Sequence, residues 1–186
     1  MDEVQAVVAV IDALDAAGIP YMLVGSLSSN AYGIPRNTKD ADFVMQLGTV
    51  PLGNLMRHLP PGFRLESQVG FETITASTRY RVRYEPLTFL IELFEVTDEP
   101  YDQGRFGRRV ETVYGGRKAY LPRPEDVIVT KLRWSKGGRR TKDIEDVRNV
   151  LAVQQGHLDL AYIRTWARQH DTLELFERLL TETPLI

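Results

Sequence analysis

The sequence predicts an α+β fold, in which a small mixed β-sheet is flanked by helices and followed by a helical C-terminal part. Short runs with strand-like alternation fall between residues 21 and 120. Apolar residues at helical spacing dominate residues 124–180 instead. We therefore expect an α/β core over residues 1–121 and a helical region over residues 122–186 that packs on it.

The elements of the expected core follow from periodicity and from turn residues. Apolar residues recur at helical spacing in the first helix, and Gly18 is well placed to end it. Gly115 and Gly116 are typical of a hairpin turn. The expected elements are a helix at 2–17, strands at 21–24 and 40–47, a short helix at 49–59, strands at 64–68, 72–77, 80–84 and 87–96, and a hairpin at 105–120.

Helix-start signals organise the C-terminal part. Pro124 suits the first position of a helix, and the acidic Glu125 and Asp126 favour its positive end. Thr141, Asp159 and Asp171 are good N-caps. We expect helices from 124 towards 137, from 141 through 151, from 159 to 170 and from 171 to 180.

Length and composition exclude several classes of protein. The chain has 186 residues, 43% of them hydrophobic and 26% charged, as in an ordinary globular protein. It has no cysteine, which excludes disulfides and thiolate metal sites and fits a reducing cytoplasm. A formal net charge of -2 implies no overall attraction to nucleic acid or to an anionic membrane. Neither a signal peptide nor a membrane span is visible, so we expect a cytoplasmic protein with no membrane partner.

The stretch from Pro20 to Leu47 carries the strongest signal for chemistry. Alternation places Ala41 and Phe43 on one face of a strand, with Asp40 and Asp42 on the other. The two carboxylates are then roughly 7 Å apart along the strand. Such like charges repel unless a cation lies between them. Oxygen ligands of this kind suit Mg²⁺ or Mn²⁺, completed by phosphate oxygens.

A phosphate-binding turn is expected just before this strand. Gly25 and Ser26 stand where the first strand gives way to a short helix. Glycine allows a ligand to approach the backbone, and free N–H groups at a helix start favour an anion. A phosphate turn followed by an Asp-x-Asp strand supplies the parts needed for metal-assisted phosphoryl or nucleotidyl transfer.

These residues resemble the signature of the nucleotidyltransferase superfamily. The likeness is greatest to small bacterial and archaeal members of the minimal and abortive-infection (toxin–antitoxin) type. It is sharp over residues 20–47 and looser through 91–94 and 124–151. The matching residues are Gly25-Ser26 and Tyr32-Gly33-x-Pro35-Arg36-x-Thr38-x-Asp40-x-Asp42.

The resemblance implies a metal-dependent enzyme that moves a nucleoside monophosphate from an NTP, such as ATP, to a hydroxyl acceptor. RNA or tRNA, a protein or a small antibiotic-like molecule would each fit as acceptor, and a toxin–antitoxin partner protein is implied. Asp40 and Asp42 would hold Mg²⁺ or Mn²⁺. The implied nucleotide- and phosphate-binding residues are Gly25, Ser26, Arg36, Thr38, Lys131 and Lys142.

Glu92 is the candidate third carboxylate. It lies in a mostly apolar strand, where an ionised carboxylate is costly unless it is paired or metal-bound. The resemblance implies a metal ligand or a base for the attacking hydroxyl, although the family more often has Asp there. The alternatives are an edge-strand glutamate that faces water, and Glu95 as the third carboxylate in its place.

Three groups of basic residues stand out, and two of them, residues 131–142 and Arg36, allow more than one interpretation. Six basic residues occur between Lys131 and Lys142 with no acid among them. They fit either a solvated helix end or a clamp for a triphosphate or RNA backbone, in which Asp143 orients a basic residue. Arg36 is either a phosphate ligand or a turn residue paired to an acid. Arg105, Arg108 and Arg109 are interpreted as a charged, solvated edge strand.

Two other classes of function stay open at this stage. One is a non-catalytic interaction protein that keeps the fold, such as an antitoxin-like partner. The other is an RNA-binding module built on residues 131–142. Intact Asp40 and Asp42 argue against the first. The near-neutral charge and the lack of interleaved aromatic residues argue against the second.

Overall fold

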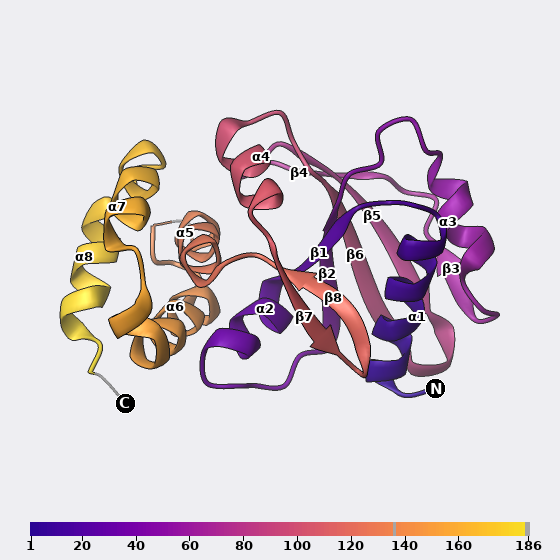
Figure 1. Ribbon diagram of the computed structural model, residues 1–186, viewed down its shortest axis with the longest axis horizontal. Coiled ribbons are helices and arrows are strands. Elements are labelled where there is room, and N and C mark those ends of the chain that lie inside the picture. The colour runs from indigo at the N-terminus through magenta and orange to yellow at the C-terminus, as the bar shows by residue number, and fades with distance from the viewer. Residues whose placement is uncertain (136, 185–186) are drawn as a thin grey trace. The chain divides into compact units, whose positions relative to one another are not determined.

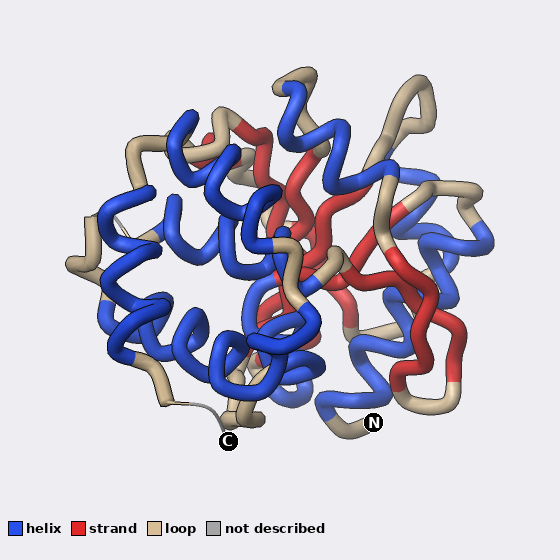
Figure 2. Tube along the Cα trace, turned by 60° about the vertical axis from the view of Figure 1, so that its left-hand side comes forward, coloured by secondary structure: helices blue, strands red, loops and turns tan. Residues whose placement is uncertain are grey.

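The fold is α+β, as the sequence predicts (Figure 1, Figure 2). The computed structural model describes residues 1–135 and 137–184. The chain forms two compact units, in which residues 1–24 join 38–121, and residues 25–37 join 122–186. Both are discontinuous in sequence, because the segment 25–37 groups with the C-terminal helices. The expected boundary at 121/122 coincides with one end of each unit.

The first unit is built on a mixed β-sheet. Its strands are β1 (Tyr21–Val24), β2 (Asp40–Met45), β3 (Phe63–Leu65), β4 (Gly70–Glu72), β5 (Ser77–Tyr84) and β6 (Phe89–Glu95). The spatial order is β1-β2-β6-β5-β3, and β4 also pairs with β5. β2 runs parallel to β6, whereas the other pairs are antiparallel. The central strands β2 and β6 therefore have neighbours on both sides.

One face of this sheet is apolar and the other is polar. Phe43, Ile91 and Leu93 are fully buried on the apolar face. The helices α1 (Glu3–Ala16) and α3 (Leu52–His58) pack against each other in the same unit, and α1 buries an apolar stripe that includes Ile11 and Leu14. Burial of this apolar area is the main driving force for folding. The opposite face of the sheet carries Asp40 and Asp42 of β2 and Glu92 of β6.

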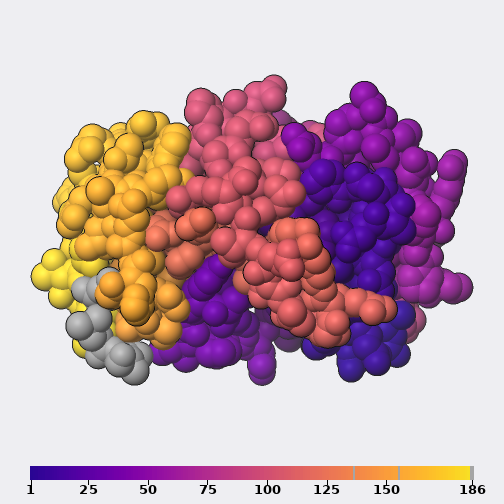
Figure 3. Space-filling model, viewed as in Figure 1, coloured from indigo at the N-terminus to yellow at the C-terminus, as the bar shows by residue number. Residues whose placement is uncertain are grey.

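The first unit ends in a hairpin of β7 (Val110–Tyr114) and β8 (Arg117–Leu121). Gly115 and Gly116 form its turn with φ of 55° and 79°, a backbone conformation that favours glycine, so this part of the prediction is confirmed. The hairpin tip lies against α1 (Figure 3), where a Cβ added to Gly115 would lie 2.5 Å from Val8 Cγ2.

The expected hairpin over 105–120 begins too early, because residues 100–107 form a helix instead. α4 (Pro100–Gly107) has proline in its first turn. Arg105 is 5% exposed and pairs with Asp102 at 2.7 Å, so its assignment to a solvated edge strand is wrong. Burial alone would raise the pKa of Asp102, but the charge of Arg105 and the hydrogen bond from Thr97 outweigh it and lower that pKa.

Two other expected elements differ in their ends. The strand expected at 72–77 stops at Glu72, whose carboxylate accepts hydrogen bonds from the N–H groups of Ile74 and Thr75 and so forms a turn. Asp171 does not cap the last helix. It adopts a left-handed φ of 55°, and the helix begins two residues later, at Leu173. By contrast, Asp159 caps its helix by accepting the N–H of Tyr162, as expected.

The second unit is helical. Its helices are α2 (Gly25–Tyr32), α5 (Pro124–Trp134), α6 (Thr141–Gln154), α7 (Leu160–Gln169) and α8 (Leu173–Glu182). α2 packs against α5 and α6, α5 also against α6 and α7, and α8 against α6 and α7. Short 3₁₀ turns, η1 (Glu85–Leu87) in the first unit and η2 (Gln155–His157) in the second, complete the described secondary structure.

α2 packs so closely on α6 that one added methyl group between them should lower the stability of the protein measurably. A Cβ added to Gly33, just after α2, would lie 2.9 Å from both the carbonyl carbon of Asn149 and the amide nitrogen of Val150. These are backbone atoms of α6, which cannot rotate away. Gly33→Ala should therefore lower the free energy of unfolding by about 1–3 kcal/mol in urea titrations.

Gly53→Ala is the matched control. Gly53 lies in α3, and an added Cβ meets nothing within 4 Å. This substitution should be neutral or stabilising by up to about 1 kcal/mol, because alanine is the better helix former. Equal stability of the two variants would contradict the close approach of Gly33 to α6.

Candidate functional site

The first unit brings three carboxylates of the central strands to one face of the sheet. Asp40 and Asp42 project from β2, and the parallel register places Glu92 of β6 directly beside Asp42. Val24, the last residue of β1, pairs with Asp42 on its other side. The backbone of Asp42 is therefore held between two strands.

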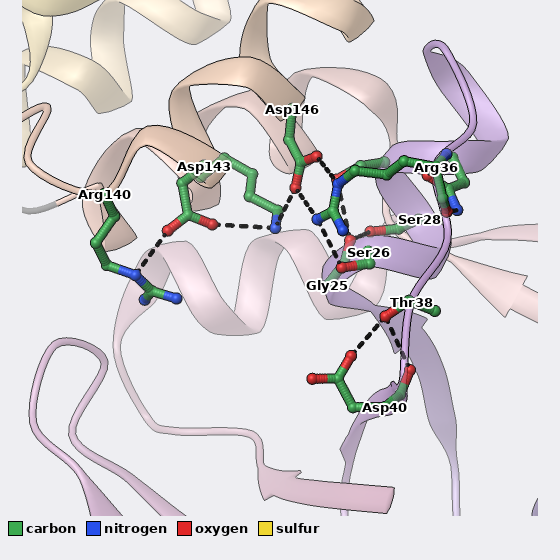
Figure 4. A network of polar contacts seen from close by, with 12 residues as sticks. Gly25, Ser26, Ser28, Arg36, Thr38, Asp40, Arg140, Asp143 and Asp146 are labelled. Atoms are coloured by element: carbon green, nitrogen blue, oxygen red, sulfur yellow. Dashed lines mark hydrogen bonds and ion pairs between the residues drawn. The ribbon is translucent and has the colours of Figure 1, made fainter. Parts of the chain in front are cut away.

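Asp40 is oriented by a neighbouring hydroxyl. Thr38 Oγ1 lies within hydrogen-bond distance of Asp40 Oδ1 and 3.2 Å from the Asp40 carbonyl oxygen (Figure 4). Both aspartates are half-buried, so neither is hidden in the core. A pair of oriented, accessible carboxylates fits the part-protein coordination that Mg²⁺ usually takes when phosphate oxygens supply other positions.

Glu92 is engaged by arginines. Its Oε1 lies 3.0 Å from Arg81 Nε and 3.3 Å from Arg79 Nη1, and its side chain is 16% exposed. β6 lies between β2 and β5, so the alternative of an edge-strand glutamate facing water is wrong. Its role as metal ligand or base stays a prediction. In the described part of the chain, no three Asp, Glu or His side chains are already arranged to hold a metal ion.

Glu95, the competing candidate, shares the face of Ile91 and Leu93 rather than that of the two aspartates. Its carboxylate accepts a hydrogen bond from the hydroxyl of Tyr80 at 3.3 Å. Glu95 therefore lies on the opposite face of the sheet from Asp42.

In the second unit, the start of α2 is organised around its first glycine. Gly25 has φ of 61°, a left-handed conformation, and its carbonyl oxygen accepts the hydroxyls of Ser28 and Ser29 at 3.0 Å each. The first N–H groups of any helix lack intrahelical partners and suit an anion. Ser26 lies in this first turn and is buried.

Arg36 links the start of α2 to α6. Its Nη2 donates to Ser26 Oγ at 2.8 Å, and its Nε and Nη2 donate to the two oxygens of Asp146 at 2.7 and 2.9 Å. The Arg36 backbone is fixed as well, because Asn30 both donates to its carbonyl and accepts from its N–H. Arg36 is therefore paired to an acid. Its contact with phosphate stays a prediction.

Lys131 continues the same network. Its Nζ lies 2.7 Å from Asp146 Oδ2 and 3.1 Å from Asp143 Oδ1, and Asp143 Oδ2 in turn lies 3.1 Å from Arg140 Nε. Figure 4 shows the chain of polar contacts that runs from Arg140 through Asp143 and Asp146 to Arg36 and Ser26. Asp143 thus orients basic residues, as the sequence suggested. The burial of Lys131, whose side chain is 9% exposed, argues for a fixed charge rather than a mobile one.

The rest of the basic segment is spread over different environments. Lys142, in the first turn of α6, and Arg139 are exposed. Lys136 lies outside the described residues. Since Lys131 and Arg140 already face acids, the segment is not an uninterrupted basic strip. This distribution weakens the interpretation of residues 131–142 as an RNA-tracking module.

Asp146 received no role of its own from the sequence, although it ends the Lys-Asp-x-x-Asp pattern of residues 142–146. It is 2% exposed and joins both cations of the network. Burial alone would raise its pKa, but hydrogen bonds from Arg36 and the charge of Lys131 outweigh burial and lower its pKa. The spacing of Asp143 and Asp146, three residues apart on one helix face, was the available signal.

Comparisons with known proteins show which solved structures share this fold. No protein-family model matches the chain, and no curated protein matches its sequence. A crystal structure of ANT(2″)-Ia in complex with adenylyl-2″-tobramycin is similar, with TM-score 0.65 and 16% identity over 91% of this chain and 97% of that chain. An antigenic nucleotidyltransferase-like protein from Paracoccidioides brasiliensis is also similar. Its TM-score is 0.56 and its sequence identity 20%, over 100% of this chain and 95% of that chain.

The lincosamide antibiotic adenylyltransferase LnuA, bound to lincomycin, is also similar, with TM-score 0.50 and 13% identity over 81% of this chain and 98% of that chain. The chain therefore has a fold shared with nucleotidyltransferases, and the predicted fold class is confirmed. Within the described residues, no helix is long and apolar enough to cross a membrane.

The buried network predicts a pH-dependent role for Asp146 in stability. Asp146→Asn should lower the free energy of unfolding at pH 7 by about 3 kcal/mol or more, because it leaves Arg36 and Lys131 without their shared counter-charge. The folded-state pKa lies below the usual 3.8, so the carboxylate stabilises the protein above that value. The difference from wild type should shrink as the pH falls below about 4.

Glu145→Gln is the matched control, because Glu145 is the exposed neighbour of Asp146 on α6. Urea titrations at several pH values should show a change within about 0.5 kcal/mol for this variant. A pH-independent loss in Asp146→Asn would mean that packing, rather than charge, explains its effect.

Proposed function

We propose that this protein is a metal-dependent nucleotidyltransferase, which moves a nucleoside monophosphate from an NTP to a hydroxyl acceptor. The observation that carries the proposal is the pair Asp40 and Asp42 on one face of β2, in a fold shared with adenylyltransferases. Thr38 orients Asp40, which is the arrangement expected of a built site rather than of two solvated charges.

Each side chain has a defined part in this proposal. Asp40 and Asp42 hold Mg²⁺ or Mn²⁺, with Glu92 either completing this site or accepting the proton of the attacking hydroxyl. When bound, the metal polarises the triphosphate and stabilises the leaving group. Ser26 and the first N–H groups of α2 bind phosphate oxygens, and the neighbouring Arg36 neutralises negative charge on the pyrophosphate as it leaves.

Lys131 acts through Asp146 rather than by itself. Its Nζ lies 2.7 Å from Asp146 Oδ2, the oxygen that also accepts from Arg36 Nη2, and so fixes the carboxylate that holds Arg36. We therefore assign Lys131 and Asp146 to positioning Arg36. Lys142 is an exposed cation suited to an outer phosphate or to the acceptor.

The acceptor and the biological setting belong to the proposal as well. The similar structures of ANT(2″)-Ia and LnuA contain adenylyl-2″-tobramycin and lincomycin, so a small hydroxylated molecule is one class of acceptor. RNA, tRNA or a protein hydroxyl, and a role beside a toxin–antitoxin partner, rest on the sequence resemblance alone.

The carboxylate pair gives the first test of activity. Asp40→Ala and Asp42→Ala should each lower transfer at least about 100-fold while the protein stays folded, because each removes a metal ligand and relieves like-charge repulsion. Label transfer from an NTP to any acceptor, or to water, measures the loss. Asp98→Ala, an exposed aspartate of the same unit, is the control and should be fully active.

Metal and nucleotide should bind together. With two protein carboxylates, Mg²⁺ depends on phosphate oxygens for the rest of its coordination. Calorimetric titration of wild type with NTP should give strong binding heat in Mg²⁺ that largely disappears with chelator. Equal NTP affinity with and without the metal would contradict the proposal.

A further inference from the structure

β5 carries a row of arginines on the same face of the sheet as the carboxylates. Arg79, Arg81 and Arg83 alternate along the strand, and the register places Arg81 beside Glu92, which is itself beside Asp42. Neighbouring strands lie about 4.8 Å apart, so the backbones of Arg81 and Asp42 are roughly 10 Å apart. An arginine side chain is long enough to bring its charge close to whatever Asp42 binds.

Positive charge is in excess along this row. Arg79 Nη1 and Arg81 Nε meet a single oxygen, Glu92 Oε1, while Arg83 Nη2 lies 2.8 Å from Glu66 Oε1. The closest contact of the Arg81 guanidinium with Glu92 is made by Nε, at 3.0 Å. Arg79 Nε is buried without a hydrogen-bond partner. Two guanidinium groups that share one carboxylate oxygen therefore carry more positive charge than this carboxylate neutralises.

The arginines are also accessible. The side chains of Arg79 and Arg81 are 26% and 38% exposed, whereas Glu92 between them is 16% exposed. Both arginine side chains are therefore partly open to solvent in the folded strand. Planar guanidinium groups match the geometry of phosphate oxygens and bind them in a bidentate manner.

We propose that Arg79 and Arg81 recognise a phosphate group on the acceptor, an inference that rests on the proposed function. The phosphate replaces Glu92 as the partner of the two guanidinium groups. Glu92 is then free to take the proton of the acceptor hydroxyl. The hydroxyl oxygen bonds to the α-phosphorus of the NTP, the bond from that phosphorus to the bridging oxygen breaks, and pyrophosphate leaves with the electron pair.

This arrangement defines the acceptor by its chemistry. The acceptor carries a phosphate near the reacting hydroxyl, as in a nucleotide, a sugar phosphate or the end of an RNA strand. A polycationic aminoglycoside such as tobramycin, named with the structural neighbour ANT(2″)-Ia, would instead be repelled by the unmatched arginine charge. The phosphate requirement also keeps Glu92 paired until a suitable acceptor arrives.

The test compares acceptors that differ in phosphate. Uridine, uridine 5′-phosphate, the trinucleotide UpUpU and tobramycin are each incubated with labelled NTP, Mg²⁺ and wild-type protein. Transfer to the phosphate-bearing acceptors should exceed transfer to uridine by about tenfold or more in kcat/KM, as expected for charge-assisted hydrogen bonds. Preference for uridine 5′-phosphate indicates a small acceptor. Preference for UpUpU, with binding that weakens steeply in salt, indicates RNA.

Variants then assign the preference to the arginines. Arg81→Ala should bring the ratio of phosphate-bearing to neutral acceptor close to unity, and should weaken binding of labelled UpUpU or uridine 5′-phosphate measured without NTP. Arg81→Lys keeps the charge without the fork and should give an intermediate ratio, which covers the case that Arg81→Ala does not fold. Arg117→Ala, an exposed arginine paired with Asp12, is the matched control and should keep the wild-type ratio.

The outcomes separate the two proposals. If Mg²⁺ and NTP bind but uridine is used as well as uridine 5′-phosphate, if tobramycin is preferred, or if no acceptor is modified, the arginine inference is wrong and the proposed function is left to other acceptors. If Arg81→Ala keeps the wild-type ratio of phosphate-bearing to neutral acceptor, the arginine inference is also wrong. If NTP does not bind with metal at all, the proposed function fails and the inference falls with it.

Discussion

The pairing of β2 between β1 and β6 is the constraint on which the first unit depends. Side chains alternate along a strand, so a slip of one residue would turn Asp40 and Asp42 into the core and Phe43 outward. Pairing on both sides makes such a slip costly, because hydrogen bonds to two neighbours would break together. The same pairing brings Glu92 beside Asp42 and Arg81 beside Glu92. One register therefore sets the positions of acids and arginines alike.

The second unit depends on charge neutralisation. A carboxylate as buried as Asp146 is stable only with close cations, and Arg36 and Lys131 supply them from two other segments. Removing Asp146 takes from Arg36 and Lys131 the carboxylate that they share, so the network links the loop after α2 to α5 and α6. The first turn of α2 is thereby held in place through the contact between Arg36 and Ser26.

The sequence predicted elements with strong local signals and missed those set by long-range contacts. The alternation around Asp40 and Asp42 and the glycine turn at 115–116 are local, and both were read correctly. Helix α4 was missed because its eight residues include two glycines and a proline and few apolar residues. The partners of Glu92 could not be deduced, because the pairing of β5 with β6 is set by the sheet and not by spacing in the chain.

The assignment of residues 25–37 to the second unit limits how the two units can be separated by recombination. The chain enters the helical unit for this short segment, returns to the sheet unit, and re-enters the helical unit at residue 122. The C-terminal helices are therefore not an independent cassette, because α2 and Arg36 come from the N-terminal part. A fusion or recombination event that joined residues 122–186 to another sheet would keep Lys131 but would lack α2 and Arg36, the other counter-charge of Asp146. The two units should accordingly be inherited together. Substitutions near Arg36 are constrained by Asp146, which lies more than a hundred positions away in the chain.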